Sequence, residues 1–340
     1  MNQIKQIVRK NVQLCILLGI FLILFIVMSV LSPSKFFTPN NLVSMMFQMS
    51  EFGILAIAMS VVILTGGINL SLSYGSMLAA ILGTLLMQRM TGAGIHPILT
   101  MISGMVVILL VSMLLGAVNG FFISYIGVLP ILVTLGTRSV FEGIGLNITK
   151  GMAVSGYPSD FTIFGNGNLA GIPIPFIIYV IVIIVTTILI QRTPWGVSVY
   201  MMGGNKTATE LSGINTKRVL MGVYILSGAL CGVAGIIMAS RYNSARTDYG
   251  NSYIMQSVAA SVLGGTDING GEGTIIGTVV GVAILQVISS GLNIFGMNRN
   301  LVDILTGAIL VVVLLIRFFT GHEKRANKKA LLLQINKQDV

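Results

Sequence analysis

Long apolar runs separated by short polar stretches are the main pattern along the chain. Most runs approach the roughly 20 residues that an α-helix needs to cross the hydrocarbon core of a membrane, although several are shorter. The pattern predicts about ten transmembrane helices, at residues 13–31, 42–63, 68–88, 97–118, 122–147, 173–190, 219–240, 252–264, 274–295 and 301–319. The expected fold is an all-α integral membrane protein with one transmembrane domain over residues 13–319.

Composition supports this fold class. Hydrophobic residues make up 54% of the 340 residues and charged residues only 9%, against about 25% charged residues in a typical soluble domain. So few charges cannot cover a surface that faces water. The two cysteines, Cys15 and Cys231, each lie in an apolar run and are expected to be free thiols.

Basic residues set the expected orientation of the helices. The net charge is +10, and Lys and Arg are concentrated in the two tails and in residues 191–218. We therefore expect the N-terminal tail (1–12), the loop 191–218 and the C-terminal tail (320–340) to lie in the cytoplasm. Membrane orientation accounts for the positive charge, so no nucleic-acid partner is expected. The first apolar run is too long for a signal peptide and predicts an uncleaved helix.

Two Gly-rich polar breaks with similar sequences interrupt the apolar pattern. They read ILTGGINLSLSY (63–74) and VLGGTDINGGEGT (262–274). Irregular backbone survives at membrane depth only where it is buried in protein or lines a watery cavity. Two such breaks in corresponding halves of a weak internal repeat indicate a substrate pathway; the alternative is a pair of ordinary tight turns at the membrane surface.

The polar side chains of the two breaks are the candidate pathway residues. Their hydroxyl and amide groups can donate and accept hydrogen bonds without requiring a charged partner, which suits an uncharged, hydroxyl-rich solute. These residues are Thr65, Asn69, Ser71, Ser73, Thr266, Asp267 and Asn269.

Three charged residues lie well away from the ends of the predicted membrane helices. Glu51 lies in the second helix, and Arg138 and Glu142 lie one helical turn apart in the fifth. Each such charge costs roughly 2.5–3.5 kcal/mol at the centre of a membrane helix, so we expect these residues to face the bundle interior and to pair. The spacing predicts an ion pair between Arg138 and Glu142. A role in ion or proton coupling, as in a secondary transporter, is the alternative.

Residue patterns for catalysis or metal binding are missing from the sequence. The two histidines, His96 and His322, do not lie near a carboxylate or cysteine cluster. The sequence also lacks the Gly-x-x-x-x-Gly-Lys-Ser/Thr loop that cradles nucleotide phosphates. We therefore expect no enzyme activity, no metal and no cofactor bound by this chain.

The predicted cytoplasmic loop contains a short helix signal, GGNKTATELSGINTKR (203–218). Thr207 and Glu210 have the spacing of a capping box, in which each side chain satisfies a free backbone amide. Gly213 suits the end of a helix. The pattern predicts a helix at about 208–212 with Ala208 and Leu211 on one face. The segment could re-enter the bilayer or dock a soluble partner.

Several stretches together resemble a known family. They are LSPSKFFTPNNL (31–42), the first break, GGNKTATELSGINTKR (203–218), LSGALCGVAGII (226–237), SVAASVLGGTDINGGEGTIIGTVVG (257–281) and SGLNIFGM (290–297). In this order, from about residue 31 to 319, they resemble the ribose-type permeases of bacterial ATP-binding-cassette importers. One departure is Asn69, which stands where that family usually has Asp.

The resemblance implies a function and a set of partners. The chain would be a permease of the bacterial plasma (inner) membrane that passes a monosaccharide delivered by a periplasmic or lipid-anchored binding protein. A second permease copy, identical or not, would complete the pathway, and a separate cytoplasmic ATPase would hold ATP and Mg. A branched-chain amino-acid permease is the near alternative. The residues of the coupling helix, which would contact the ATPase, are Asn205, Thr207, Ala208, Glu210, Leu211 and Gly213.

Overall fold

The computed structural model describes residues 12–298 and positions 301, 304–305, 307–308 and 311. Both predicted tails and most of the predicted helix 301–319 therefore lie outside the described residues. In chain order the elements are α2 (Val12–Leu31), α3 (Pro39–Ile63), α4 (Leu72–Gly92), α5 (Pro97–Phe121), the π-helix η1 (Phe122–Ile126), α6 (Pro130–Thr149), β1 (Val154–Ser155), the 3₁₀-helix η2 (Ser159–Thr162), α7 (Ile163–Asn166), β2 (Asn168–Leu169), β3 (Ile172–Pro173), α8 (Ile174–Arg192), α9 (Pro194–Gly204), α10 (Lys206–Leu211), α11 (Thr216–Tyr242), β4 (Ser244–Ala245), α12 (Asn251–Leu263) and α13 (Ile275–Ile294).

The predicted all-α membrane fold is confirmed. Six helices in the described part are long and apolar enough to cross a membrane, namely Leu14–Leu31, Pro39–Ile63, Pro97–Ile126, Ile174–Arg192, Thr216–Tyr242 and Ile275–Ile294. Helices α4 and α6 have comparable lengths of 21 and 20 residues, whereas α12 has only 13. The strands of the described part form two antiparallel pairs, β1 with β4 and β2 with β3. The count of ten membrane helices stays a prediction.

One predicted boundary is wrong. The sequence predicts a helix at 122–147, but residues Phe122–Ile126 continue α5 as a π-helix. The chain then turns at Gly127, whose φ of 87° is left-handed and suits glycine. Helix α6 begins only at Pro130, because proline has the right φ for the first turn of a helix and needs no amide partner there. Apolarity alone did not reveal this turn.

Local signals explain where several helices begin. Thr38, Thr193 and Thr274 each precede a helix, and each hydroxyl accepts a hydrogen bond from the backbone amide three residues later. This bond satisfies one of the free amides at a helix start. Pro39 and Pro194 occupy the first helical position after two of these caps.

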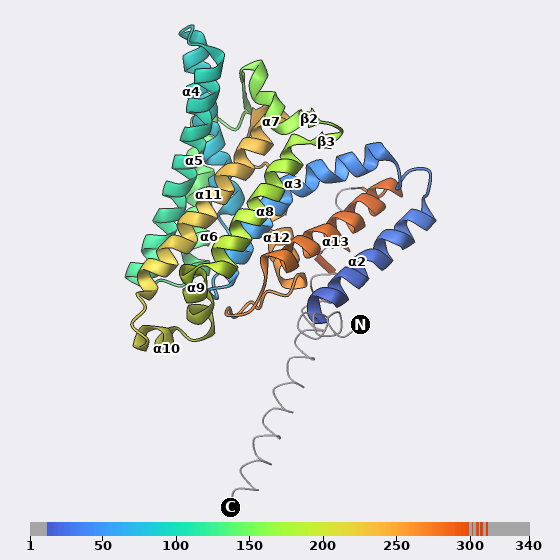
Figure 1. Cartoon of the computed structure of the whole chain (residues 1–340). Helices are drawn as coiled ribbons and strands as arrows, with labels where there is room; N and C mark the ends of the chain where they lie inside the picture. Colours follow the sequence, from blue (N-terminus) through green and yellow to red (C-terminus); the bar gives the residue numbers. More distant parts are fainter. Residues whose placement is uncertain (1–11, 299–300, 302–303, 306, 309–310, 312–340) are drawn as a thin grey trace, which may run out of the picture.

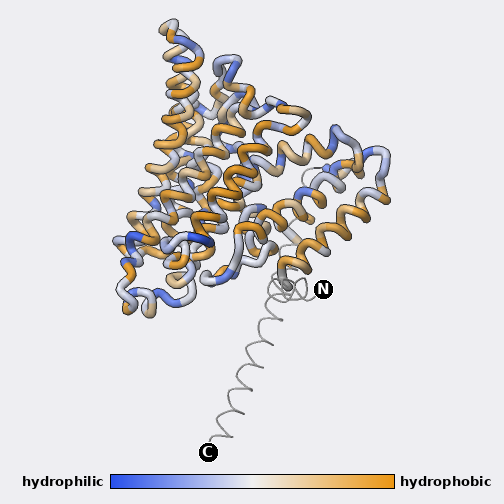
Figure 2. The backbone as a smooth tube through the Cα atoms, in the orientation of Figure 1, coloured by the Kyte–Doolittle hydropathy of each residue, from blue (hydrophilic) through white to orange (hydrophobic). Residues whose placement is uncertain are grey.

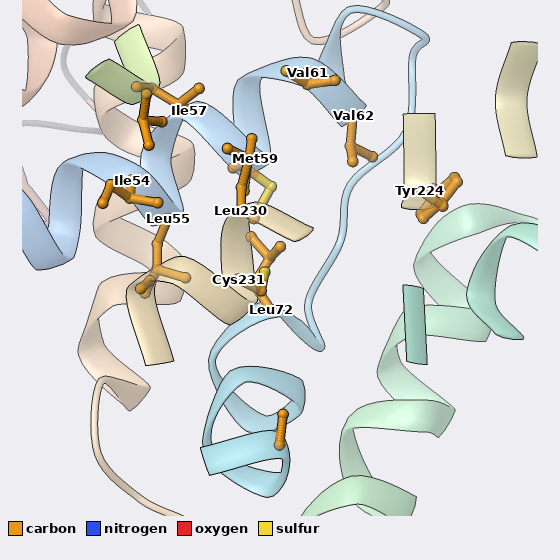
Figure 3. Close-up of a cluster of buried hydrophobic side chains, with 14 of the residues drawn as sticks. Ile54, Leu55, Ile57, Met59, Val61, Val62, Leu72, Tyr224, Leu230 and Cys231 are labelled. Atoms are coloured by element: carbon orange, nitrogen blue, oxygen red, sulfur yellow. The ribbon is translucent and has the colours of Figure 1, made fainter. Parts of the chain in front are cut away.

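Helix α3 lies at the centre of the core. It is buried continuously from Ser50 to Ile63, as expected for a helix that is apolar on all sides. Figure 3 shows its side chains gathered with Leu230 and Cys231 of α11 and with Leu72 at the start of α4. The core thereby joins the second, third and seventh long apolar runs.

The bundle has two distinct ends (Figure 1). Helices α9 and α10 lie at one end, which we call the α10 end, and α7, β2 and β3 lie at the opposite end. Hydrophobic residues follow the bodies of the helices, and hydrophilic residues gather at the turns of both ends (Figure 2). This distribution is the one expected for helices that span an apolar layer between two aqueous phases.

Candidate functional site

The two Gly-rich breaks are turns of helical hairpins, and they lie against each other. The first turn (residues 64–71) joins α3 to α4, and the second turn (residues 264–274) joins α12 to α13. The amide of Gly271 donates a hydrogen bond of 2.9 Å to the carbonyl oxygen of Leu64. An added Cβ at Gly66 would stand 2.9 Å from the carbonyl oxygen of Asn269. The fold therefore brings the two sequence breaks together into one site.

In the first turn the polar side chains point into the bundle. Asn69 Oδ1 accepts hydrogen bonds from Ser71, at 3.1 Å from its amide and 2.8 Å from its hydroxyl. Asn69 Nδ2 donates to Ser227 Oγ at 3.4 Å, and Asn119 Nδ2 donates to Ser71 Oγ at 2.8 Å. All four side chains are buried. The network ties the start of α4 to α5 and α11.

Asn119 and Ser227 are members of this network that the sequence analysis missed. Each is a polar residue within a long, mostly apolar helix, and neither lies in the two Gly-rich breaks. The signal that could have found them is the cost of burying an amide or hydroxyl in an apolar run without a partner.

A small cavity adjoins the network. It measures about 10 Å³ and is lined in part by Asn69, Ser71, Ser112, Asn119 and Cys231, which is close to the volume that one water molecule needs. Asn119 Oδ1 is buried and has no hydrogen-bond partner among the residues that the structure describes. The cavity is far too small for a sugar.

The remaining first-turn candidates have other partners. Ser73 Oγ donates a hydrogen bond of 2.9 Å to the carbonyl oxygen of Tyr249. Thr65 is half-buried, and its hydroxyl donates to the carbonyl oxygen of Val62 at 2.8 Å. Both side chains therefore bond to backbone in the described conformation.

The second turn is more open to solvent. Asp267 is half-buried and Asn269 is exposed. Asp267 Oδ1 accepts hydrogen bonds from the amide and the side-chain nitrogen of Asn269, at 2.9 and 3.0 Å. Thr266 is buried instead, and its hydroxyl lies 3.3 Å from Ser60 Oγ of α3. In the second turn, Asp267 and Asn269 therefore bond mainly to each other.

Glu51 faces the bundle interior and pairs, as predicted, and its partner lies in a distant helix. Its side chain is fully buried and lies 3.1 Å from Arg241 at the end of α11. The hydroxyls of Tyr242 and Tyr253 donate to Glu51 Oε2 at 3.0 and 3.2 Å. This cluster joins α3 to α11 and α12, and removing one partner would leave an uncompensated buried charge.

The predicted ion pair between Arg138 and Glu142 is wrong. Arg138 Nη2 instead donates a hydrogen bond of 3.1 Å to the hydroxyl of Tyr74, and its guanidinium lies 4.8 Å from the centre of the same ring. The aromatic face attracts the cation, so a partner on α4 replaces the neighbour on α6. Glu142 forms no ion pair in the described part of the chain.

The predicted short helix exists, but its cap is different. Helix α10 spans Lys206–Leu211, and the side chain of Asn205 caps it by accepting from the amide of Ala208 at 3.0 Å. The capping box of Thr207 and Glu210 is therefore wrong. Asn205 lies at the residue before the helix with extended backbone, which is the position that a cap requires, while Glu210 accepts from Thr216 of α11 at 2.6 Å.

The end of α10 is as predicted. Gly213 has a left-handed φ of 80°. Its amide donates to Glu210 at 3.0 Å, and the amide of Ile214 donates to Thr209 at 3.3 Å. These two bonds form a Schellman motif, which satisfies the last carbonyl groups of a helix. Within α10 only Thr209 is buried, and Leu211 is 86% exposed, so the segment does not re-enter the bundle.

The opposite end carries its own ordered polar structure. Strand β1 pairs with β4 there and joins the loop after α6 to the end of α11. Arg246 binds Asp248 through both side-chain nitrogens that face it, and this hydrogen bonding lowers the pKa of the Asp248 carboxyl. Burial raises the pKa of Tyr157 to about 12. This end is therefore a structured surface.

Metal ligands do not gather in the described residues, where no group of three or more His, Cys, Asp or Glu side chains could hold an ion. The described cysteines, Cys15 and Cys231, are both free, and burial encloses the second of them. The polar groups of the site are hydroxyls and amides, which can bind and orient a neutral solute.

Comparison with known proteins gives consistent matches. A family model described as "Branched-chain amino acid transport system / permease component" matches residues 41–314. The ribose import permease protein RbsC of Bacillus subtilis (strain 168) is 38% identical over 88% of this chain and 90% of its own. The D-allose transport system permease protein AlsC of Escherichia coli (strain K12) is 33% identical over 86% of this chain and 89% of its own.

A third relative is the autoinducer 2 import system permease protein LsrD of Yersinia enterocolitica, 33% identical over 90% of this chain and 92% of its own. No solved structure matches the chain significantly. The resemblance inferred from the sequence motifs is confirmed by these matches. The chain forms a helical membrane bundle whose two turns carry hydroxyl and amide groups, and the family model matches it along most of its length. The chain therefore belongs to this family of multi-pass transport permease components.

Proposed function

We propose that this chain is the permease subunit of an ATP-binding-cassette importer for a monosaccharide or a similar hydroxyl-rich solute. The observation that carries the proposal is the exposed, doubly capped helix α10 at the same end of the bundle as both Gly-rich turns. The relatives named for ribose, allose and autoinducer 2 support this class of solute.

The distribution of charge supports one orientation in the inner membrane. Arg192, Lys206, Lys217 and Arg218 lie in or beside α8, α10 and α11 at the α10 end, and basic residues favour the cytoplasmic side of a membrane. The α10 end then faces the cytoplasm with both termini. The opposite end faces outward, where a periplasmic or lipid-anchored binding protein delivers the solute.

The two turns form the cytoplasmic part of the translocation pathway. In the described conformation, Asn69, Ser71, Ser73 and Thr266 are buried and bonded within the chain. Thr65, Asp267 and Asn269 are only partly covered. Opening displaces both turns and exposes the buried hydroxyl and amide groups to the solute. A second permease copy, identical or related, forms the other wall of the pathway.

Helix α10 is the contact for the ATPase subunit. That subunit binds ATP and Mg and performs the hydrolysis. Leu211 supplies an exposed apolar side chain that a cleft in the ATPase can bury, and buried apolar anchors carry much of the energy of a protein interface. Asn205 and Gly213 hold the helix ends, so a push on α10 moves a defined element.

The membrane charges do not favour the secondary-transporter alternative. Glu51 is paired with Arg241, and Arg138 is bound to Tyr74, so these two groups already have structural partners. The relatives named for ribose and D-allose transport favour a sugar-like solute over a branched-chain amino acid.

The test is a charge on the exposed face of α10. Leu211→Arg should weaken association with the ATPase by about 30-fold or more, because losing an interface anchor costs about 2 kcal/mol. Folding should be unaffected, since Leu211 is 86% exposed. Co-purification of the ATPase with the tagged permease from native membranes measures the association.

The matched control is Leu169→Arg, which places the same change on a leucine of β2 that is 63% exposed at the opposite end. This variant should retain the ATPase. Equal retention of the ATPase by wild type and Leu211→Arg would contradict the assignment of α10.

A further inference from the structure

The C-terminal end of α9 touches both turns at a single point. An added Cβ at Gly203 would stand 1.9 Å from the carbonyl oxygen of Leu64 and 2.4 Å from the amide nitrogen of Gly271. These two atoms are hydrogen-bonded to each other at 2.9 Å. Three backbone segments that are far apart in the sequence therefore meet where only glycine fits.

Further close approaches extend this contact, which we call the glycine junction (Gly66, Gly203, Gly270 and Gly271). An added Cβ at Gly270 would stand 2.6 Å from the amide nitrogen of Gly66, and one at Gly271 would stand 2.7 Å from the Cα of Gly204. Gly66, Gly270 and Gly271 also have left-handed φ angles of 76°, 89° and 79°. Backbone contacts like these contain no flexible side chain that could absorb a displacement.

A second tie lies one helical turn earlier on α9. The hydroxyl of Tyr200 donates a hydrogen bond of 2.9 Å to the carbonyl oxygen of Gly273, in the second turn. This bond fixes the rotation of α9 against the second turn. Helix α9 is thereby held to the pathway turns by both backbone and side chain.

Helix α9 leads directly into α10. Asn205 is at once the residue that ends α9 and the residue that caps α10. Its amide donates to the carbonyl oxygen of Met201 at 2.9 Å, and its own carbonyl oxygen accepts from the hydroxyl of Thr209 at 2.8 Å. With one residue between the two helices, a displacement of α10 reaches Gly203 without crossing a flexible loop.

We propose that Gly203 and Tyr200 are positioning residues that transmit the movement of α10 to both turns at once. The inference rests on the proposed contact of α10 with an ATPase. Packed backbone elements switch between discrete arrangements instead of deforming continuously. Displacement of α9 then opens or closes the two turns together, because the same glycine contacts Leu64 in one turn and Gly271 in the other.

The test compares two adjacent glycines of α9. Gly203→Ala inserts a methyl group into the junction, whereas Gly204→Ala meets nothing within 4 Å. Both variants are reconstituted in proteoliposomes with the ATPase and the binding protein. Co-purification of the ATPase, stimulated ATP hydrolysis and solute uptake are then measured.

For Gly203→Ala, we expect normal association with the ATPase but uptake per ATP hydrolysed that is lower by about tenfold, since overpacking shifts a conformational equilibrium by this order. Gly204→Ala should match wild type. A Gly203→Ala protein that transports with wild-type stoichiometry would overturn the inference. A wild-type chain that neither binds an ATPase nor supports ATP-driven uptake would overturn the proposed function instead.

If Gly203→Ala does not fold, Tyr200→Phe decides. This variant removes only the hydroxyl, which binds Gly273 and also interacts with Gln191, and should lower the uptake per ATP by about threefold, the effect of one ordinary hydrogen bond. Its matched control is Tyr125→Phe, at an exposed tyrosine of η1. Unchanged stoichiometry in Tyr200→Phe would overturn the role of the junction.

Discussion

The two Gly-rich turns look alike in the sequence but differ in how the fold encloses them. Asn69 in the first turn is 3% exposed and belongs to a network that includes Ser227 of α11. Asn269 in the second turn is exposed, and its amide and side-chain nitrogen both donate to Asp267, two residues away. The same Ile-Asn dipeptide thus contributes a buried asparagine that anchors the first turn and an exposed asparagine with only local bonding in the second turn.

The difference follows from what surrounds each turn. Helices α5 and α11 pack against the start of α4, so polar groups of the first turn must find partners inside the protein. The second turn contacts α9 and the first turn mainly through glycine backbone, and its side chains remain partly in solvent. Asp267 and Asn269 are therefore more accessible to solvent than Asn69.

The largest expected difference in stability is between two variants in which either Asn69 or Asn269 is replaced by leucine. Asn69→Leu should destabilise the chain by about 2–4 kcal/mol, because it removes hydrogen bonds to Ser71 and Ser227 and leaves buried polar groups unpaired. Asn269→Leu should change stability by less than about 0.5 kcal/mol, as is usual for exposed positions. Unfolding of the purified variants in detergent measures both. Equal effects would break the comparison.

A smaller effect is expected within the first-turn network. Ser71→Ala should cost about 1–2 kcal/mol, since Ser71 Oγ donates to Asn69 and accepts from the buried Asn119. The same unfolding measurement applies, with Ser198→Ala as control, because Ser198 is half-buried and its hydroxyl donates to the carbonyl oxygen of Pro194 in its own helix. A Ser71→Ala variant as stable as this control would show that the network does not hold the first turn.

The smallest effect is expected in the second turn. Asp267→Ala removes the acceptor of two local hydrogen bonds and should cost less than about 1 kcal/mol, because solvent can replace a partner at a half-exposed position. If Asp267 contacts the solute, the variant should lose more solute uptake than its small loss of stability explains. A loss of stability as large as that of Asn69→Leu would remove the distinction between the turns.

The sequence predicts local features of this protein well. The apolar runs identify the long helices, and α10 and its glycine end follow from a short polar pattern. Its cap was assigned to Thr207 instead of Asn205, because two adequate capping residues lie close together and the sequence does not say where the preceding helix ends. The sequence therefore predicts features that form within one segment, such as a short helix and its cap, to within a residue or two.

Contacts between distant segments could not be predicted in the same way. Glu51 and Arg241 lie in different helices, and Arg138 pairs with Tyr74 of α4 instead of its own helical neighbour. The partner of a buried charge depends on which helices pack together, and apolar periodicity does not specify that choice. The glycine junction likewise forms where three distant segments meet. The sequence shows that each segment contains glycine but not that these glycines contact one another.

The most direct test of the import-permease account is gentle purification of the tagged chain from its native membranes, followed by mass spectrometry of the co-purified proteins. The account predicts an ATPase and a solute-binding protein in amounts comparable to the permease. A chain that lacks both companions and still takes up solute in liposomes by itself, driven by an ion gradient, would contradict it.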